Sequence, residues 1–288
     1  MIRREYRDEN WYMLYTPEDG ARIDRLQYRD VDLLTTRPES FRPPRRDYGR
    51  YETRPVYGYD DCFPSVEESA YPGMDWRVPD HGEICWLKWD AVPHDNGVFF
   101  IVKSSRLPLV FKRKMVFTES ELQWHFEVVN HGDKTYPFQH VIHPMIPLDD
   151  VSAVELPEFS ETHDAIRNKK LELKSAPELS RFLLARPRGS ANMLFVRGVA
   201  SNRVYFELRK QLGLTIVFPA EYFSTIGIWW NRDGYPDEEG LRRNECAFEP
   251  VPGSNSTLSD AFEENRCLFV EPRQRFRWQI SWHLQAVD

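Results

Sequence analysis

Three short segments, far apart in the chain, carry side chains that can give and take protons near neutral pH. His81 lies in a Pro-Asp-His-Gly sequence, His143 lies in a Gln-His-Val-Ile-His-Pro sequence, and Glu249 precedes Pro250. Imidazoles and carboxylates act as general acids and bases when burial and nearby charges bring their pKa values toward the operating pH. If the fold brings the three segments together, they could catalyse a reversible proton transfer.

Histidine and glutamate at these positions also have ordinary structural explanations. A single histidine in a strand is more often a hydrogen-bonded part of the interior, and a glutamate before proline can simply end a strand. A second histidine, His140, lies three residues before His143. If both are in one strand, their side chains point to opposite faces, and only one can reach a shared cleft. We predict that His143 is that residue.

The spacing of His81 and Glu83 also allows a metal site, because side chains two residues apart share one face of a strand. Asp60 or Asp61 could complete an oxygen-rich set of ligands. Local groups of acids are more often solvated or paired with arginine. The prediction here is therefore no bound metal, with the metal site as the alternative.

The four cysteines have none of the short paired spacings of a zinc site or a disulfide framework. They are expected to be reduced thiols in or beside strands, and they stand at positions 62, 85, 246 and 267.

Composition limits the classes of protein that this chain can represent. Its 288 residues are 41% hydrophobic and 14% aromatic, which is enough for a substantial core. A net charge of −7 argues against a nucleic-acid partner, and the arginine-rich residues 42–50 are broken by proline and expected to form a solvated loop. No apolar run has the length of a membrane span, and the N-terminus lacks the apolar core of a secretion signal. These features predict a soluble, cytoplasmic protein with no membrane partner.

The elements that must position these residues are mostly strands, as the alternation of apolar and polar residues indicates. Residues 122–129 alternate cleanly and stop at a turn-forming Asn-His-Gly-Asp sequence. Strands are predicted at residues 84–89, 98–102, 109–117, 122–129, 136–140, 193–197, 204–208, 214–218, 225–230, 267–270 and 275–284. The first five are expected to form a meander of at least four strands. The helix candidates, residues 176–184 and 258–264, are expected to be single turns or little more.

So many strands with so little helix predict an all-β fold, a large antiparallel β-sandwich whose two curved sheets bury their aromatic faces against each other. We expect residues 1–288 to form a single domain of this kind. Residues 37–80 are rich in Pro, Tyr, Arg and Asp and have weak periodicity. Long loops of this kind on a β scaffold often carry function, so this segment is expected to line or cover a cleft.

The order of several motifs resembles the galactose mutarotase-like superfamily, which contains aldose 1-epimerases and hexose-6-phosphate epimerases. Residues 17–23 are similar to its opening hairpin, and residues 59–64 followed by 80–82 resemble its "CWP … HG" pairing. Further motifs are similar to its "N-x-x-D-x-P-x-P-F … HP", "WN" and "EP … DA" segments, and they lie at residues 130–144, 230–231 and 249–261. Each motif is weak alone, but their order is specific.

This resemblance implies the supersandwich fold of that superfamily and an aldose 1-epimerase activity on a hexose or hexose derivative. In the family, the histidine of the His-Pro motif and the glutamate of the Glu-Pro motif are catalytic, which assigns His143 as acid and Glu249 as base. The reaction opens and recloses the sugar ring by proton transfer and needs no cofactor. Five residues are predicted to bind the substrate, with Trp229 as an alternative platform for the sugar, and these five are His81, Asp61, Trp230, Asn231 and Arg77.

One departure from the family pattern bears on the substrate. The hexose-phosphate members continue with an arginine-bearing stretch where this chain has Gly82 and Glu83, and an acid there disfavours a phosphate dianion. Arg54, Arg77 or Arg232 could still supply a cation.

The same departure supports a second hypothesis, a non-catalytic carbohydrate-binding or sugar-sensing module. A third is another rearrangement or a lyase reaction on an acidic sugar, since one fold can host several chemistries. All three predict a small-molecule carbohydrate as the partner, and the protein could be a monomer or a homodimer.

Overall fold

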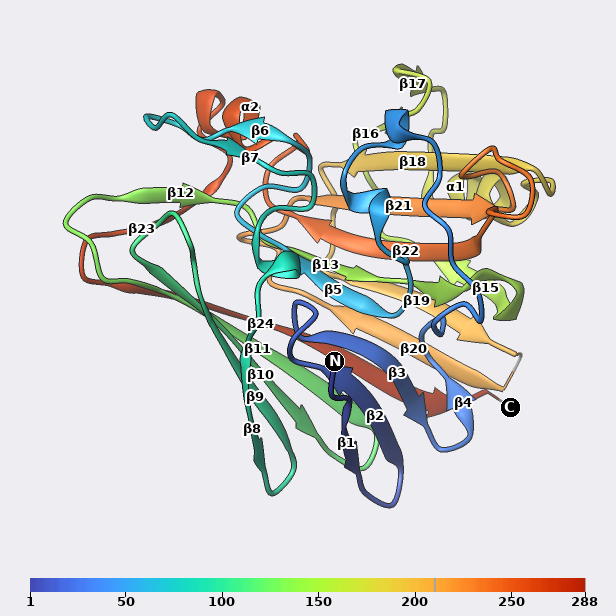
Figure 1. Ribbon diagram of the computed structural model, residues 1–288. Helices are drawn as coiled ribbons and strands as arrows, with labels where there is room; N and C mark the ends of the chain where they lie inside the picture. The colour runs from blue at the N-terminus through green and yellow to red at the C-terminus, as the bar shows by residue number, and fades with distance from the viewer. Residues whose placement is uncertain (210, 288) are drawn as a thin grey trace.

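The widest layer of the computed structural model, which describes residues 1–209 and 211–287, is an antiparallel sheet of eight strands (Figure 1). The strands follow the order β15-β19-β20-β24-β11-β10-β9-β8. Their bounds are β8 (Asp90–His94), β9 (Gly97–Lys103), β10 (Leu109–Phe117), β11 (Glu121–Asn130), β15 (Val151–Glu155), β19 (Arg203–Leu208), β20 (Leu212–Val217) and β24 (Arg275–Ala286).

Two six-stranded antiparallel sheets face this layer. The first has the order β1-β2-β3-β5-β13 with β4 beside β3, and the second has the order β14-β22-β21-β18-β16-β17. The first contains β1 (Arg4–Arg7), β2 (Trp11–Thr16), β3 (Arg22–Tyr28), β4 (Val31–Asp32), β5 (Tyr59–Cys62) and β13 (Val141–Pro144). The second contains β14 (Ile146–Pro147), β16 (Glu161–Asp164), β17 (Lys169–Leu171), β18 (Ser190–Arg197), β21 (Thr225–Arg232) and β22 (Asn244–Val251).

Short elements fill the connections between these sheets. Two-stranded ribbons form from β6 (Ser69–Ala70) with β7 (Arg77–Val78) and from β12 (Tyr136–Phe138) with β23 (Leu268–Val270). The helices are α1 (Ala176–Leu184) and α2 (Leu258–Glu263), with 3-10 turns η1 (Arg46–Tyr48), η2 (Tyr51–Thr53), η3 (Ile84–Trp86) and η4 (Leu148–Asp150). No helix of residues 1–209 and 211–287 is long and apolar enough to cross a membrane.

Aromatic side chains join the layers. Tyr59 of β5 stacks on Trp124 of β11 with ring centroids 4.5 Å apart, and Phe248 of β22 stacks on Phe206 of β19 at 5.1 Å. Both six-stranded sheets therefore bury one face against the eight-stranded sheet, as alternating strands require. The predicted all-β antiparallel sandwich is confirmed, and the four cysteines are free and buried as expected.

Most strands predicted from alternation are present, but the predicted strand at residues 84–89 is wrong. Its first part forms η3, where Ile84 and Cys85 are fully buried and the Trp89 indole Nε1 donates to the Ile84 carbonyl at 2.9 Å. An apolar and aromatic run signals burial as strongly as it signals a strand, so it does not separate the two. The four-stranded meander is β8 to β11, and β12 leaves it to pair with β23.

Helix α1 is longer than the expected single turn. The Ser175 side chain accepts a hydrogen bond from the Glu178 backbone amide, while the Glu178 carboxylate accepts one from the Lys174 amide at 2.7 Å. These two bonds satisfy amides at the start of the helix and stabilise its nine residues.

A fully buried ion pair ties β5 to the eight-stranded sheet. The Arg113 guanidinium of β10 donates to the Asp61 carboxylate and, at 2.6 Å, to the Ala21 carbonyl. Asp61 also accepts hydrogen bonds from Tyr59 at 2.6 Å and contacts His140 Nε2 at 3.0 Å. These partners hold the pKa of Asp61 below its usual value against the effect of burial.

We predict that Arg113→Met destabilises the protein by about 3–5 kcal/mol, because it leaves the Asp61 charge buried and uncompensated. Urea unfolding of the variant and the parent measures the difference. Lys112→Met is the matched control, since the Lys112–Glu127 pair is partly exposed and worth about 0–1 kcal/mol. Equal losses for the two variants would contradict the importance of the buried pair.

Candidate active site

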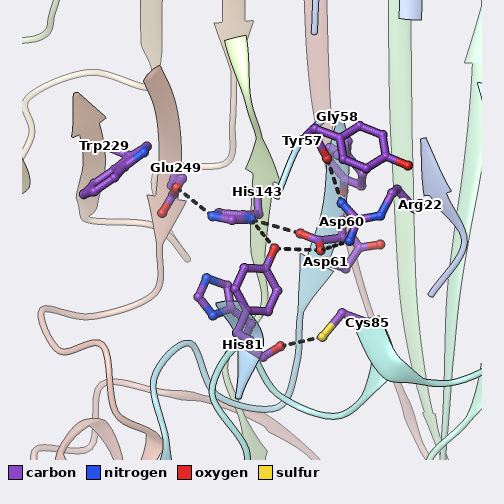
Figure 2. A network of polar contacts seen from close by, with 12 residues as sticks. Arg22, Tyr57, Gly58, Asp60, Asp61, His81, Cys85, His143, Trp229 and Glu249 are labelled. Carbon is purple, nitrogen blue, oxygen red and sulfur yellow. Dashed lines mark hydrogen bonds and ion pairs between the residues drawn. The ribbon is translucent and has the colours of Figure 1, made fainter. Parts of the chain in front are cut away.

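The pairing of β5 with β13 brings His143 to a buried carboxylate. Asp60 and His143 are register partners, and His143 Nδ1 lies 2.9 Å from Asp60 Oδ1 (Figure 2). With Nδ1 bonded to Asp60, the other ring nitrogen, Nε2, faces the opposite side of the imidazole. A histidine held in this way has one nitrogen fixed by its hydrogen bond and another that can exchange a proton with a ligand.

Glu249 lies on the Nε2 side of the His143 ring. Strand β14 pairs with β22, with Ile146 opposite Cys246, and the chain between β13 and β14 joins the two six-stranded sheets. Glu249 Oε1 is 3.9 Å from His143 Nε2. The carboxylate and the imidazole are both nearly buried and face each other.

Gly227 of β21 makes room for the Glu249 side chain. The two residues are register partners, and a Cβ built on Gly227 would lie 3.2 Å from Glu249 Oε2. A larger residue at this position would displace the carboxylate.

The long connection between β4 and β5 places a tyrosine over the histidine. The Tyr51 hydroxyl donates to Asp60 Oδ2 at 2.8 Å, and its oxygen lies 3.2 Å from His143 Nδ1. Its ring stacks on His81, with centroids 3.6 Å apart and an interplanar angle of 8°. Tyr51 therefore fixes the positions of both histidines relative to Asp60.

His81 occupies a tight turn rather than a strand. Its φ of 61° lies in the left-handed region, and Gly82 follows with φ of 72°. A Cβ on Gly82 would lie 2.0 Å from the Phe63 carbonyl oxygen, so only glycine fits. His81 Nδ1 is 3.1 Å from Asp80 Oδ1, and the His81 and His143 ring centroids are 4.8 Å apart.

Burial and neighbouring charges shift the pKa values of the facing pair. Burial alone would lower the pKa of His143, but the hydrogen bond to Asp60 and nearby carboxylates raise it above the usual value. Burial raises the pKa of Glu249, although the charges of His143 and His81 oppose the shift. These directions keep an imidazolium donor beside a carboxylate with increased proton affinity, the two components that proton transfer needs.

Asp60 remains ionised in this buried position. Burial opposes its ionisation, but the His143 hydrogen bond and the Arg22 guanidinium, 3.5 Å away, hold its pKa well below the usual value. Arg22 is also buried and donates to the Tyr57 carbonyl at 2.7 Å. The charge that orients His143 is therefore itself compensated.

A cavity of about 310 Å³ opens beside the pair. Its lining includes His81, His143, Glu249 and Trp229. The long loop region contributes Tyr48, Tyr51, Glu52, Val56, Val66 and Glu67. The expectation that residues 37–80 line a cleft is confirmed. This size and this mixture of apolar walls with a few convergent polar groups suit a small-molecule site.

One wall of the cavity contains a bridged arginine. Arg243 Nη1 donates to Glu52 at 2.8 Å, and Arg243 Nε donates to Glu245 Oε1 at 2.7 Å. Glu245 Oε1 also accepts from the Trp229 indole at 3.1 Å. The bridge links η2, which carries Tyr51, to the strands that carry Trp229 and Glu249.

The structure brings His81, His143 and Glu249 together but places the other predicted substrate-binding residues elsewhere. Trp230 points into the core, one position away from Trp229, which does line the cavity. Asn231 is buried and donates to the Tyr235 carbonyl at 2.7 Å.

Asp61 and Arg77 also lie outside the cavity. Asp61 is used by the buried Arg113 pair described above. Arg77 is exposed and paired with Glu68. Of the three alternative cations, Arg54 donates to the Cys85 carbonyl and to Asp19, and Arg232 donates to the Arg186 carbonyl at 3.1 Å, so none of the arginines proposed from the sequence lines the site.

Sequence reasoning missed Tyr51 and the true position of Asp60. Asp60 and Asp61 are adjacent, so in a strand one faces the cleft and the other faces the core. The sequence therefore indicates that the two aspartates face opposite ways, but not that one of them meets His143. Tyr51 lies in a loop without periodicity, where no pattern could identify it.

The alternative metal site at His81 and Glu83 is not supported by their geometry. Because the segment is a turn, the two side chains diverge, and the Glu83 carboxylate accepts from the Ser105 amide at 3.0 Å and from the Ser104 and Ser105 hydroxyls. Within residues 1–209 and 211–287, no group of three or more His, Cys, Asp or Glu is arranged to hold a metal ion.

Comparison with known proteins gives matches at the level of structure. No family model and no curated protein sequence matches the chain. A protein from Synechocystis sp. PCC 6803 matches with a TM-score of 0.75 and 14% identity, covering 100% of this chain and 96% of that chain. A candidate aldose 1-epimerase from Escherichia coli K12 matches with a TM-score of 0.72 and 12% identity over 99% of both chains.

A galactose mutarotase-like protein from Lactobacillus casei ATCC 334 matches with a TM-score of 0.69 and 14% identity, over 99% of this chain and 100% of that chain. The chain therefore has the galactose mutarotase-like fold. This confirms, at the level of the fold, the resemblance read from its motifs.

We predict that Asp60→Asn lowers the pKa of His143, because burial then acts without the carboxylate that opposes it most strongly. NMR titration of the histidine ring protons measures the shift. Asp164→Asn is the matched control, since Asp164 is equally buried but its partners are Arg167 and Asn192. An unchanged His143 titration in Asp60→Asn would contradict the assigned electrostatics.

Proposed function

We propose that this protein is an aldose 1-epimerase that interconverts the α and β anomers of a hexose or hexose derivative. The observation that supports it best is the buried pair of His143 and Glu249, whose facing atoms are 3.9 Å apart at the wall of the cavity. The anomeric hydroxyl oxygen and the ring oxygen of a sugar are bonded to the same carbon. The acid and the base of this reaction must therefore be close together, as these two are.

In the proposed reaction, the Glu249 carboxylate takes the proton of the C1 hydroxyl while His143 Nε2 donates a proton to the ring oxygen. The bond between C1 and the ring oxygen breaks, which gives the open-chain aldehyde. Rotation about C1–C2 presents the other face of the aldehyde, and the ring closes as Glu249 returns its proton and His143 regains one. Protons and electrons balance over the cycle, and the enzyme ends as it began.

The other residues of the site have supporting roles in this proposal. Asp60 stabilises the imidazolium form of His143, and Tyr51 holds both Asp60 and His81 in place. His81, whose ring centroid is 4.8 Å from that of His143, is the candidate donor to a sugar hydroxyl, and Trp229 offers an aromatic face to the C–H surface of the sugar.

We predict that Glu249→Gln and His143→Asn each reduce anomer exchange by about 10²–10⁴-fold, the usual range for loss of a general acid or base. One-dimensional NMR exchange spectroscopy of anomeric protons over a panel of free, phosphorylated and acidic hexoses measures the rates. His125→Asn and Glu155→Gln, both outside the cavity, are controls that should retain activity.

The same experiment tests the rival hypothesis. Sugar binding without any acceleration of exchange by the parent protein would favour a non-catalytic carbohydrate-binding or sugar-sensing module. Acceleration that survives in both site variants would contradict the assigned acid and base.

The pKa directions also predict a bell-shaped dependence of kcat/KM on pH. The rising limb reports deprotonation of Glu249 and should lie above pH 4.5, since the pKa of Glu249 is raised. The falling limb reports deprotonation of His143 and should lie above pH 6.5, since the pKa of His143 is also raised. Because the two groups interact, both limbs belong to the pair. A falling limb below pH 6.5 would contradict the acid role of His143.

A further inference from the structure

The sheet that carries Glu249 presents an apolar row beside the catalytic pair. Met193, Trp229 and Ala247 are register partners across β18, β21 and β22. Continuing the β14–β22 register by one residue places Met145 beside Ala247. Side chains two residues apart share a face, so this row lies directly next to the row that contains His143 and Glu249.

The row of the pair itself is also apolar beyond the two catalytic side chains. Gly227 of β21 is the register partner of Glu249, and Phe195 of β18 is the register partner of Gly227. Phe195, Met193, Trp229 and Met145 all line the cavity. We call these residues of the two rows the floor of the cavity. Among them, His143 and Glu249 are the groups that can make strong hydrogen bonds to a ligand. Figure 2 shows Trp229 next to Glu249.

The remaining polar groups of the cavity come from loops. Apart from three tyrosines and the Glu52–Arg243 pair, they are Glu67, Asp80, His81 and Ser256. Two of the four are carboxylates. Burial would raise the pKa of Asp80, but its contacts with His81 keep that pKa below its usual value. An anionic sugar would meet these charges.

The lining includes one arginine, and its charge is already used. Arg243 lies between Glu52 and Glu245, and both carboxylates are nearly buried. These two charges raise the pKa of Arg243 against the effect of burial. A phosphate or a sugar carboxylate would have to displace a buried ion pair to reach this guanidinium, which is costly.

We propose that the substrate is an uncharged deoxyhexose, with the missing hydroxyl at C2, which is bonded to C1, or at C6, which is bonded to the carbon on the other side of the ring oxygen. This inference rests on the proposed epimerase function. With the C1–ring oxygen bond held at His143 and Glu249, the neighbouring substituents project along the floor toward Met145, Trp229 and Met193. A hydroxyl buried there without a partner loses its hydrogen bonds to water, whereas a methyl or methylene group gains from contact with the same surface.

The test compares kcat/KM for anomer exchange of D-glucose and D-galactose with their 2-deoxy and 6-deoxy forms and their 6-phosphates. We expect at least one deoxy form to exceed its parent by about 10–100-fold, the discrimination that an apolar pocket achieves for a single hydroxyl. The phosphates should be the poorest substrates.

A variant pair tests whether the apolar floor is the cause. Met193→Gln puts an amide of similar size on the floor and should reduce the preference for the deoxy sugar several-fold. Met74→Gln is the matched control, an exposed methionine outside the cavity, and should keep the preference of the parent.

Three outcomes would contradict these statements in different ways. Parent hexoses or phosphates that react as fast as every deoxy form would overturn the substrate inference and leave the epimerase function standing. A preference that Met193→Gln does not change would overturn the role of the floor. No acceleration of any sugar would overturn the proposed function and, with it, this inference.

Discussion

The candidate site depends on two adjacent carboxylates buried on one short strand. Asp60 and Asp61 of β5 are almost completely inaccessible to solvent, and each must be compensated because a buried unpaired charge is strongly destabilising. Their side chains point to opposite faces. Asp61 meets Arg113 and so fastens β5 to the eight-stranded sheet, while Asp60 meets His143 and so sets the protonation of the cleft. Because the two residues are adjacent, the packing of β5 in the core also fixes the position of the carboxylate that contacts His143.

A second layer of ionic contacts holds the long loop region over the cleft. Tyr51 and Glu52 are neighbours, yet one contacts Asp60 and the other contacts Arg243. The bridge from Glu52 through Arg243 to Glu245 thereby connects the loop to the strands of the floor. It also neutralises an arginine that would otherwise attract anions. The same contacts that order the loop therefore shape the charge of the cavity.

Alternation predicted six of the eight strands of the widest sheet, and motif order predicted three residues that line the cavity, His81, His143 and Glu249. Alternation missed β5 and β22, the strands that carry Asp60 and Glu249. Prediction failed where neighbouring residues of one strand point to opposite faces of the sheet. Trp229 lines the cavity and Trp230 lies in the core, although the sequence alone gives both the same character. Because consecutive side chains of a strand point to opposite faces, an error of one position assigns a core residue to the cavity.

The sequence by itself determined the kind of fold and indicated a candidate chemistry. Its alternation allows little besides an antiparallel sandwich, and an imidazole and a carboxylate in separate motifs suit proton transfer. The tertiary structure alone decided that Asp60 orients His143 and that Tyr51 stacks on His81. These contacts join residues separated by long stretches of chain. They follow from strand register and loop path, which sequence spacing does not encode.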